Sequence, residues 1–457
     1  MKVLMVSWEY PPVVVGGLGR HVHQLAVHLA AIGHDVVVLS RQPSGSDGKT
    51  HPPTDQVVEG VRVIAIPEDP PHFDFGEDMM AWTLGMGHAL VRAGVRLRAL
   101  NEIPAELPDA DDDATGPRTT EPWIPDVVHA HDWLVAHAAI ALAEFFDVPM
   151  VSTIHATEAG RHSGWVSGRV NRQVHSVEWW LAAESDALIA CSESMHDEVS
   201  RLFGPDLAEI HVIHNGIDLQ QWPFNHEPPR GGTNGFADSP PRLLFAGRLE
   251  YEKGIQDAIA ALPAIRRTHP GTTLAIAGDG TQLGWLTAEA RRHGVADAVR
   301  FIGRVTHDEL LTLLHDCDAI VLPSRYEPFG IVALEAAATG APLITSTAGG
   351  LGDAVTDGVS GLSFEPADVA ALAEAVRTVL DDPDAAARRA ATARERLTDF
   401  TWDRAAERTE EVYLGAKRRV RQPVGRPHII ERPLPERDPE KPSNADSAAP
   451  MQPGAEM

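Results

Sequence analysis

Two short segments in the second half of the chain carry the charged side chains that are best placed for chemistry. Residues 247–254 (GRLEYEKG) contain Arg248 and Lys253, and residues 327–335 (EPFGIVALE) have a glutamate at each end. Arginine presents a rigid fork of donors and lysine a mobile point charge, a combination that suits a diphosphate. Carboxylates beside an anion site need such cations close by. The two segments therefore predict a site for a sugar nucleotide.

The second segment is expected to follow a buried strand. Residues 320–322 form a short apolar run and residues 330–338 have a helical pattern, so Glu327 lies in the loop between them. Ligands of open α/β sheets bind at this end of the strands. Free amides at the helix start favour a phosphate oxygen or a sugar hydroxyl, and Glu335 can meet another part of the same ligand. These amides belong to Phe329, Gly330 and Ile331.

An alternative applies to each glutamate taken singly. A lone glutamate in such a loop more often caps or solvates the start of a helix than it binds a ligand. Because two separate segments supply complementary charges, a shared ligand is the better interpretation for Glu327 and Glu335.

A glycine-rich loop opens the first half of the chain. Gly16 and Gly17 stand between a predicted strand at residues 3–6 and a helical run at residues 20–32. Glycines at this point permit a ligand to approach the backbone at the start of the helix. The spacing is not that of a dinucleotide-binding loop. Taken alone, the loop would be an ordinary tight turn.

Histidines follow two further predicted strands. The segment HAHDW at residues 129–133 contains Asp132 and Trp133, and His155 ends the strand at residues 150–154. Two histidines and an aspartate suggest a metal, but no further ligand is suitably spaced, so histidines that pack in a loop are favoured and no metal site is predicted. Trp133 could stack on a sugar, although such an aromatic is more often part of the core. A single histidine such as His155 is normally structural.

Composition limits the class of protein. A chain of 457 residues with 43% hydrophobic residues is long enough for two to three domains. Its formal net charge of −26 excludes nucleic acids and anionic membranes as general partners. Cys191 and Cys317 are expected to be reduced and buried. Because no apolar run approaches the length of a membrane span, a cytoplasmic location is predicted.

Strand-like runs alternate with helical patterns in two series, which predicts an α/β fold with two doubly wound, Rossmann-like parallel-sheet domains that face each other across a cleft. The first domain is expected at residues 1–226 and the second at residues 242–401. The predicted strands are residues 3–6, 36–39, 61–66, 127–129, 150–154, 187–191 and 210–213, then 243–246, 274–277, 299–302, 319–322 and 343–345.

Three segments lack this alternation. Residues 227–241 are rich in proline and glycine and are predicted to be the interdomain linker. Residues 104–122 are acidic with few apolar residues and are predicted to form a mobile loop, and residues 422–457 a disordered tail. The amphipathic pattern at residues 402–417 predicts a last helix.

At residues 247–254 and 327–335 the chain closely resembles the retaining glycosyltransferases of family 4, whose fold is called GT-B. The resemblance implies that Glu327 contacts the transferred sugar and Glu335 the ribose hydroxyls. It implies further that Arg248 and Lys253 hold the departing phosphates and that helix 402–417 packs back on the first domain. The glycine loop of Gly16 and Gly17 would lie over the donor phosphate and sugar, and the base would lie near Arg304 and Val305.

Within this family the segment HAHDW is similar to one in glycogen and starch synthases, where the aspartate lies near the acceptor glucan. By this resemblance Asp132 and Trp133 would bind the acceptor, and His155 would contact the donor sugar and support the reacting centre. One departure is that glycogen synthases usually carry lysine at the position of Val14. Arg20, Arg248 and Lys253 would then have to supply the missing positive charge.

The resemblance covers residues 1–417 and points to glycogen-synthase-like enzymes of actinobacteria. It implies a transferase that moves glucose from ADP-glucose or UDP-glucose to the non-reducing end of an α-1,4-glucan, in glycogen or methylglucose lipopolysaccharide synthesis, with no cofactor or metal. A first alternative is a family 4 mannosyl- or N-acetylglucosaminyltransferase with a small or lipid-linked acceptor. A second is a non-catalytic protein that binds glucan or nucleotide on the same fold.

Overall fold

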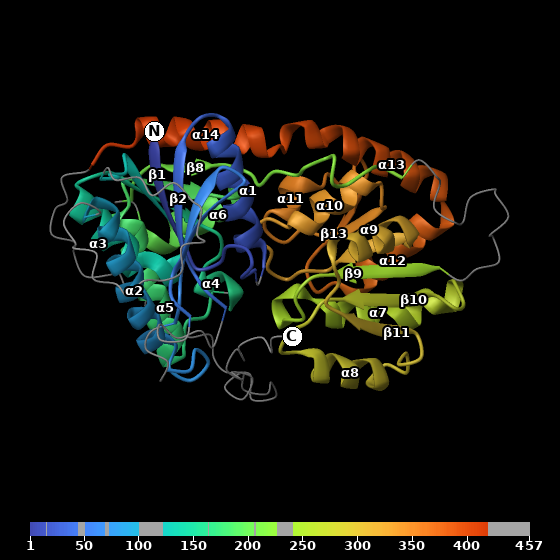
Figure 1. The fold of residues 1–457 in the computed structure, drawn as a ribbon. Helices are drawn as coiled ribbons and strands as arrows, with labels where there is room; N and C mark the ends of the chain where they lie inside the picture. Colours follow the sequence, from blue (N-terminus) through green and yellow to red (C-terminus); the bar gives the residue numbers. More distant parts are fainter. Residues whose placement is uncertain are drawn as a thin grey trace.

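A computed structural model describes residues 1–14, 16–43, 51–68, 73–99, 122–162, 164–204, 207–225 and 241–418. Figure 1 shows two lobes side by side, each built around its own sheet. This confirms the predicted α/β class with two parallel-sheet units. The domain limits stay a prediction, because almost all of the predicted linker at residues 227–241 lies outside the described residues. So do the predicted tail and all but the last residue of the predicted loop at residues 104–122.

The first sheet has the strand order β3-β4-β2-β1-β5-β6-β7-β8, and all of its pairs are parallel except β3 with β4. Its helices α2, α3 and α5 cover one face and α1 the other. The strands are β1 (Lys2–Ser7), β2 (Asp35–Arg41), β3 (Thr54–Val58), β4 (Val61–Ile66), β5 (Val127–His131), β6 (Met150–Ile154), β7 (Ala187–Ala190) and β8 (Ile210–Val212). The helices are α1 (Gly17–Ala31), α2 (Met79–Ala99), η1 (Trp133–Val135), α3 (Ala136–Phe146), α4 (Glu158–Arg161), α5 (Arg169–Glu184) and α6 (Glu193–Phe203).

The second sheet has the order β11-β10-β9-β12-β13-β14 and is parallel throughout. Its strands are β9 (Arg242–Ala246), β10 (Thr273–Ala277), β11 (Val299–Gly303), β12 (Ala319–Leu322), β13 (Leu343–Ser346) and β14 (Leu362–Phe364). Its helices are η2 (Tyr251–Lys253), α7 (Ile255–Thr268), α8 (Leu283–Arg292), α9 (His307–Asp316), α10 (Ile331–Thr339), α11 (Leu351–Ala354), α12 (Val369–Asp381), α13 (Pro383–Arg396) and η3 (Leu397–Asp399).

Both faces of the first sheet are buried. Along β1, Val3 and Met5 belong to one apolar cluster and Leu4 and Val6 to another. A strand buried on both faces reads as a continuous apolar run, which is why residues 3–6 were recognisable in the sequence. Two strands were not predicted. The side chains of β3 are exposed along its whole length, and β14 is only three residues long.

The last helix, α14 (Trp402–Gly415), leaves the second lobe and packs on the first, where Figure 1 shows it along one side of the sheet. Trp402 and Ala406 join the apolar cluster that contains Val3 of β1 and Leu25 of α1. The Tyr413 hydroxyl lies 2.7 Å from Nδ1 of His129 in β5. The end of the chain therefore stabilises the first sheet and ties the two lobes together.

One finding bears on membranes. Within the described residues, no helix combines the length and the apolar character that crossing a bilayer requires.

We predict that Trp402→Ala lowers the free energy of unfolding by about 3–5 kcal/mol, because it removes a side chain that is 5% exposed and leaves a cavity between α14 and α1. Chemical denaturation followed by circular dichroism measures the change. Leu414→Ala on the same helix is the control: its side chain is 67% exposed, so an effect within about 0.5 kcal/mol is expected. Equal effects of the two variants would contradict the packing role of Trp402.

Candidate active site

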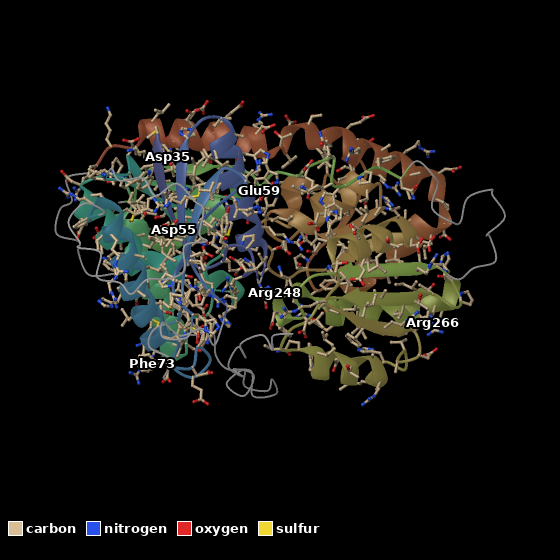
Figure 2. All side chains as sticks on the ribbon, viewed as in Figure 1. Asp35, Asp55, Glu59, Phe73, Arg248 and Arg266 are labelled. Atoms are coloured by element: carbon tan, nitrogen blue, oxygen red, sulfur yellow. The ribbon has the colours of Figure 1, made fainter. Side chains whose placement is uncertain are left out.

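The carboxyl ends of strands from both sheets meet where the lobes face each other. Arg248 lies on this side of the second lobe, whereas Arg266 lies at the far end of the same lobe (Figure 2). A Cβ built on Gly17, at the start of α1, would lie 3.4 Å from Cδ1 of Ile331, at the start of α10. The Ser192 hydroxyl of the first lobe donates to the carbonyl of Pro328, 2.6 Å away. The glycine loop and residues 327–335 are thus brought together.

Lys253 and Glu327 form the central contact of the second lobe. Lys253 Nζ lies 2.8 Å from Glu327 Oε2, and the Ser324 hydroxyl donates to the same oxygen over 3.1 Å. Both charged side chains are less than one-fifth exposed. The positive group after β9 and the carboxylate after β12 therefore converge on one point.

Arg248 is oriented by its own segment. One of its terminal nitrogens lies 3.3 Å from Glu252 Oε1, and the side chain is 37% exposed. It is therefore partly exposed at the surface of the second lobe, in the same segment as Lys253.

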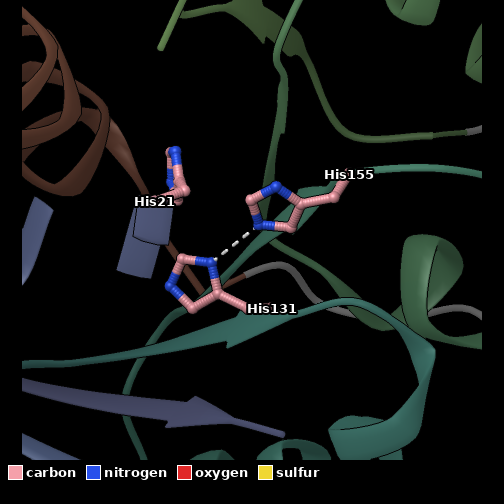
Figure 3. Close-up of side chains that lie close together, drawn as sticks. All are labelled: His21, His131 and His155. Carbon is pink, nitrogen blue, oxygen red and sulfur yellow. Dashed lines mark hydrogen bonds between the residues drawn. The ribbon is translucent and has the colours of Figure 1, made fainter. Parts of the chain in front are cut away.

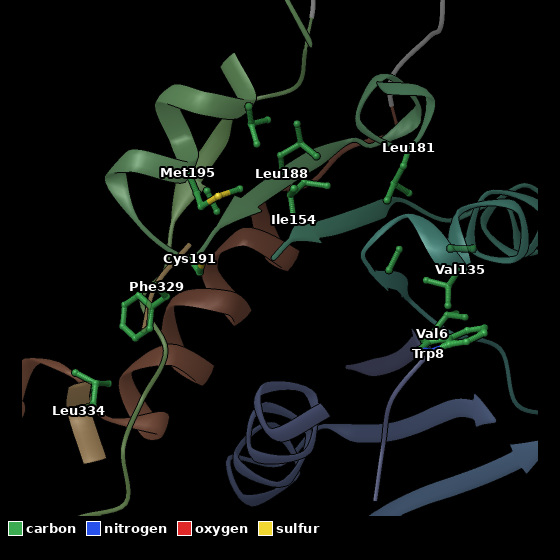
Figure 4. Packing of buried hydrophobic residues seen from close by; sticks show 14 of the residues in the cluster. Val6, Trp8, Val135, Ile154, Leu181, Leu188, Cys191, Met195, Phe329 and Leu334 are labelled. Atoms are coloured by element: carbon green, nitrogen blue, oxygen red, sulfur yellow. The ribbon is translucent and has the colours of Figure 1, made fainter. Parts of the chain in front are cut away.

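The start of α10 has the geometry expected from the sequence. Gly330 has φ of 95°, which favours glycine, and a Cβ there would lie 2.7 Å from Leu351 Cδ2. Phe329 is buried close to Cys191 of the first lobe (Figure 4). The apolar ring anchors the loop, so that the first amides of the helix, including that of Ile331, are held at the boundary between the lobes.

Glu335 lies in the second turn of α10 with its side chain 3% exposed. Its Oε1 accepts a hydrogen bond from Nη1 of Arg20 in α1 over 2.7 Å, while its buried Oε2 has no hydrogen-bond partner within the described parts of the chain. Burial raises the pKa of the Glu335 carboxyl to about 7, and the charge of Arg20 limits that increase. Arg20 thus reaches across from the first lobe to the glutamate expected at the ribose.

Asp132 and His155 are held together on the first lobe. Asp132 has φ of 63°, and its Oδ1 accepts from the backbone N–H of His155 over 2.7 Å. Burial raises the pKa of Asp132 to about 7, against the effect of that hydrogen bond. Trp133 is 8% exposed, which leaves little of its ring free to stack on a sugar.

Arg304 and Val305 follow β11 at the same edge of the second sheet. Arg304 Nε lies 3.7 Å from Asp279 Oδ2, and both side chains are more than half exposed. Val305 packs partly against the large apolar cluster. Their contact with a base stays a prediction.

Sequence reasoning missed several groups at this boundary. The Tyr326 hydroxyl donates to Glu198 Oε1 over 2.9 Å and accepts from the backbone N–H of Thr157 over 3.1 Å, and thereby joins the lobes.

His21 of α1 was also missed, and it is buried near His131 and His155. The sequence could have predicted the burial of His21, because this residue stands four positions before Leu25 and therefore lies on the same, core-facing side of the helix. Burial lowers the pKa of His21 to about 4, and those of His131 and His155 well below their usual value.

The two halves of the chain match two different protein families. Residues 16–216 match the family Glycosyl transferase 4-like domain, and residues 232–396 match the family Glycosyl transferases group 1. The glycogen synthase of Mycobacterium tuberculosis (strain H37Rv) is 64% identical to this chain over 438 residues, which cover 96% of this chain and 100% of that protein.

Solved structures share the fold. Sucrose-phosphate synthase from Thermosynechococcus elongatus superposes with a TM-score of 0.73 at 23% identity, covering 91% of this chain and 98% of that one. The catalytic domain of starch synthase IV from Arabidopsis thaliana, bound to ADP and acarbose, gives a TM-score of 0.65 at 18% identity, covering 91% and 99%. At these identities the two structures show a common architecture and no more.

We predict a pH-dependent contribution of Glu335 to stability. Its pKa is raised from 4.5 to about 7, so the folded protein binds more protons than the unfolded chain between these values. The free energy of unfolding of the wild type relative to Glu335→Gln should therefore fall as pH rises from 4.5 to 7, by on the order of 3 kcal/mol. Denaturant titrations at several pH values measure this difference.

The control for that experiment is Glu365→Gln, which changes an exposed carboxylate and should leave the free energy of unfolding within about 0.5 kcal/mol of the wild type. A difference between the wild type and Glu335→Gln that stays constant from pH 4.5 to 7 would contradict the buried, destabilised carboxylate.

Proposed function

The chain belongs to the group 1 glycosyltransferases, and from this premise we propose that it transfers glucose from ADP-glucose or UDP-glucose to the non-reducing end of an α-1,4-glucan. The observation that carries this proposal is the 64% identity with a glycogen synthase over the whole length of that protein. The starch synthase bound to ADP and acarbose, which has the same fold, is consistent with it.

In the proposed reaction the bond between C1 of glucose and the phosphate oxygen breaks, and its electrons stay on the departing nucleoside diphosphate. Arg248, Lys253 and the amides at the start of α10 stabilise that negative charge. Lys253 now contacts Glu327, 2.8 Å away. The donor would replace this contact: its phosphates would bind to Lys253 and its sugar hydroxyls would donate hydrogen bonds to Glu327.

The acceptor hydroxyl forms the new bond to C1 on the face that the diphosphate leaves. A phosphate oxygen of the leaving group takes the proton of that hydroxyl, so the configuration at C1 is retained without a protein nucleophile. His155 would contact the donor sugar, and Asp132 would position both His155 and the acceptor. The 2.7 Å contact between Asp132 and the His155 backbone supports a joint role.

Glu335 is proposed to bind the ribose of the donor. Its buried Oε2 lacks a partner within the described residues, and a ribose hydroxyl would supply the hydrogen bond. Arg20, now 2.7 Å from Oε1, lies where it can also meet the phosphates, which would compensate for Val14 in place of lysine.

The proposal includes no cofactor and no metal requirement, because Arg248, Lys253 and the helix start together supply the positive charge that a diphosphate needs. A cytoplasmic location is part of the proposal, in keeping with two free, buried cysteines. The alternative acceptor is a small molecule, which the absence of the synthase lysine at Val14 favours.

The deciding experiment incubates the purified protein with ADP-, UDP- and GDP-sugars and measures release of the nucleoside diphosphate. Maltooligosaccharides, free hexoses and hexose phosphates serve as acceptors. We expect turnover with ADP-glucose or UDP-glucose and maltooligosaccharides, and EDTA should not lower it. Turnover restricted to hexose phosphates or to GDP-mannose would overturn the glucan assignment.

We predict that Lys253→Ala lowers kcat about 100-fold or more, because it removes a positive charge from the leaving phosphates. The same nucleotide-release assay measures it. Arg266→Ala is the control, since Arg266 lies at the far end of the same lobe and pairs with Asp297. If both variants turned over at the wild-type rate, Lys253 would have no role in the reaction.

A further inference from the structure

Three buried histidines from separate elements converge beneath the candidate active site. His21 comes from α1, His131 ends β5, and His155 follows β6 (Figure 3). One ring nitrogen of each lies within 4.8 Å of one ring nitrogen of both others. His21 and His131 are at most 3% exposed, and His155 is partly accessible. The three rings are far apart in sequence, so the fold alone brings them together.

The hydrogen bond of the His21 ring leaves one of its nitrogens available as a ligand. His21 Nδ1 donates to Asn215 Oδ1 over 2.6 Å, which leaves Nε2 without a proton, and this buried atom has no partner within the described residues. A ligating histidine is typically oriented in this way, by a hydrogen bond from its other ring nitrogen.

The contact between His131 and His155 has the spacing of two ligands on one ion. His131 Nδ1 and His155 Nε2 share a hydrogen bond over 3.2 Å, drawn dashed in Figure 3, and an ion bound by both nitrogens would displace its proton. Two nitrogens on a tetrahedral Zn²⁺ at about 2.0–2.1 Å stand roughly 3.3–3.4 Å apart. In addition, buried imidazoles are favoured in their neutral form, which is the form that binds metals.

Neighbouring side chains surround the three histidines and are not themselves available as ligands. Both ring nitrogens of His129 already have partners, Tyr413 and Thr153, at 2.7 and 2.8 Å. The ring of Trp402 lies 5.7 Å from that of His21. Access is therefore from the side of His155, which faces the active site.

We propose that His21, His131 and His155 bind one divalent transition-metal ion of the Zn²⁺ type. Three protein ligands leave one coordination position for water. The ion is not needed for transfer. Instead, the bound ion holds the His155 ring away from the donor sugar and so inhibits the enzyme. This inhibition rests on the proposed function, whereas metal binding does not.

Binding is tested on the untagged, full-length protein after treatment with a chelator. Zn²⁺ is titrated in competition with a chromophoric chelator, and Co²⁺ is added to a second sample to record visible absorption. We expect one ion per chain and the intense absorption of a tetrahedral Co²⁺ site. His21→Asn should weaken Zn²⁺ binding at least about tenfold. His23→Asn is the matched control, since His23 lies on the same helix but pairs with Glu59.

Folding of the variants is checked by circular dichroism, and Zn²⁺ should raise the Tm of the wild type and of His23→Asn only. If His21→Asn does not fold, His155→Ala replaces it, because this side chain is less buried. Wild-type affinity in a folded His21→Asn or His155→Ala protein, or no stoichiometric binding by the wild type, would overturn the site.

Inhibition is tested separately in the nucleotide-release assay. Zn²⁺ should inhibit the wild type and His23→Asn in competition with the donor, and EDTA should restore turnover. Stoichiometric binding without inhibition would leave the metal site standing and refute its coupling to His155. No turnover with any donor would refute the proposed function and leave the binding result unaffected.

Discussion

In a parallel sheet all strands end at the same edge, and this constraint decides where the loops of both sheets lie. Every helix that follows a strand begins at the carboxyl edge of its sheet, and the carboxyl edges of the two sheets meet between the lobes. The residues that follow β1, β5 and β6 therefore face those that follow β9 and β12. The candidate site lies at this boundary because helices begin there with unpaired amides, while central strands such as β1 are buried on both faces.

Electrostatic pairing holds the boundary together. Lys253 contacts Glu327 within one lobe, and Arg20 contacts Glu335 between the lobes. Each pair combines a group suited to phosphate with a group suited to hydroxyls. A bound sugar nucleotide would exchange these internal contacts for its own, so the pairs keep the site polar and ordered until the donor enters.

Support for the site also comes from the end of the chain. Helix α14 returns to the first lobe and places Trp402 against His21 of α1 and Tyr413 against His129 of β5. The proposed metal site and the proposed contact with the donor sugar share His155, so the geometry of this layer matters to both proposals. The stability of the last helix and the chemistry of the first sheet are physically coupled.

The sequence by itself determined the two parallel sheets, because buried strands read as apolar runs and the helices between them as periodic ones. It also predicted that Lys253 and Glu327 converge, because their opposite charges suit a shared ligand, and the two side chains are indeed 2.8 Å apart. Tertiary structure alone decided that Arg20 meets Glu335, that Trp133 is buried and that His21 joins His131 and His155. These contacts join segments up to 315 residues apart, and no local pattern encodes such distances. The exposed strand β3 was missed for a different reason: its backbone pairs with β4, but its exposed side chains form no buried apolar pattern in the sequence.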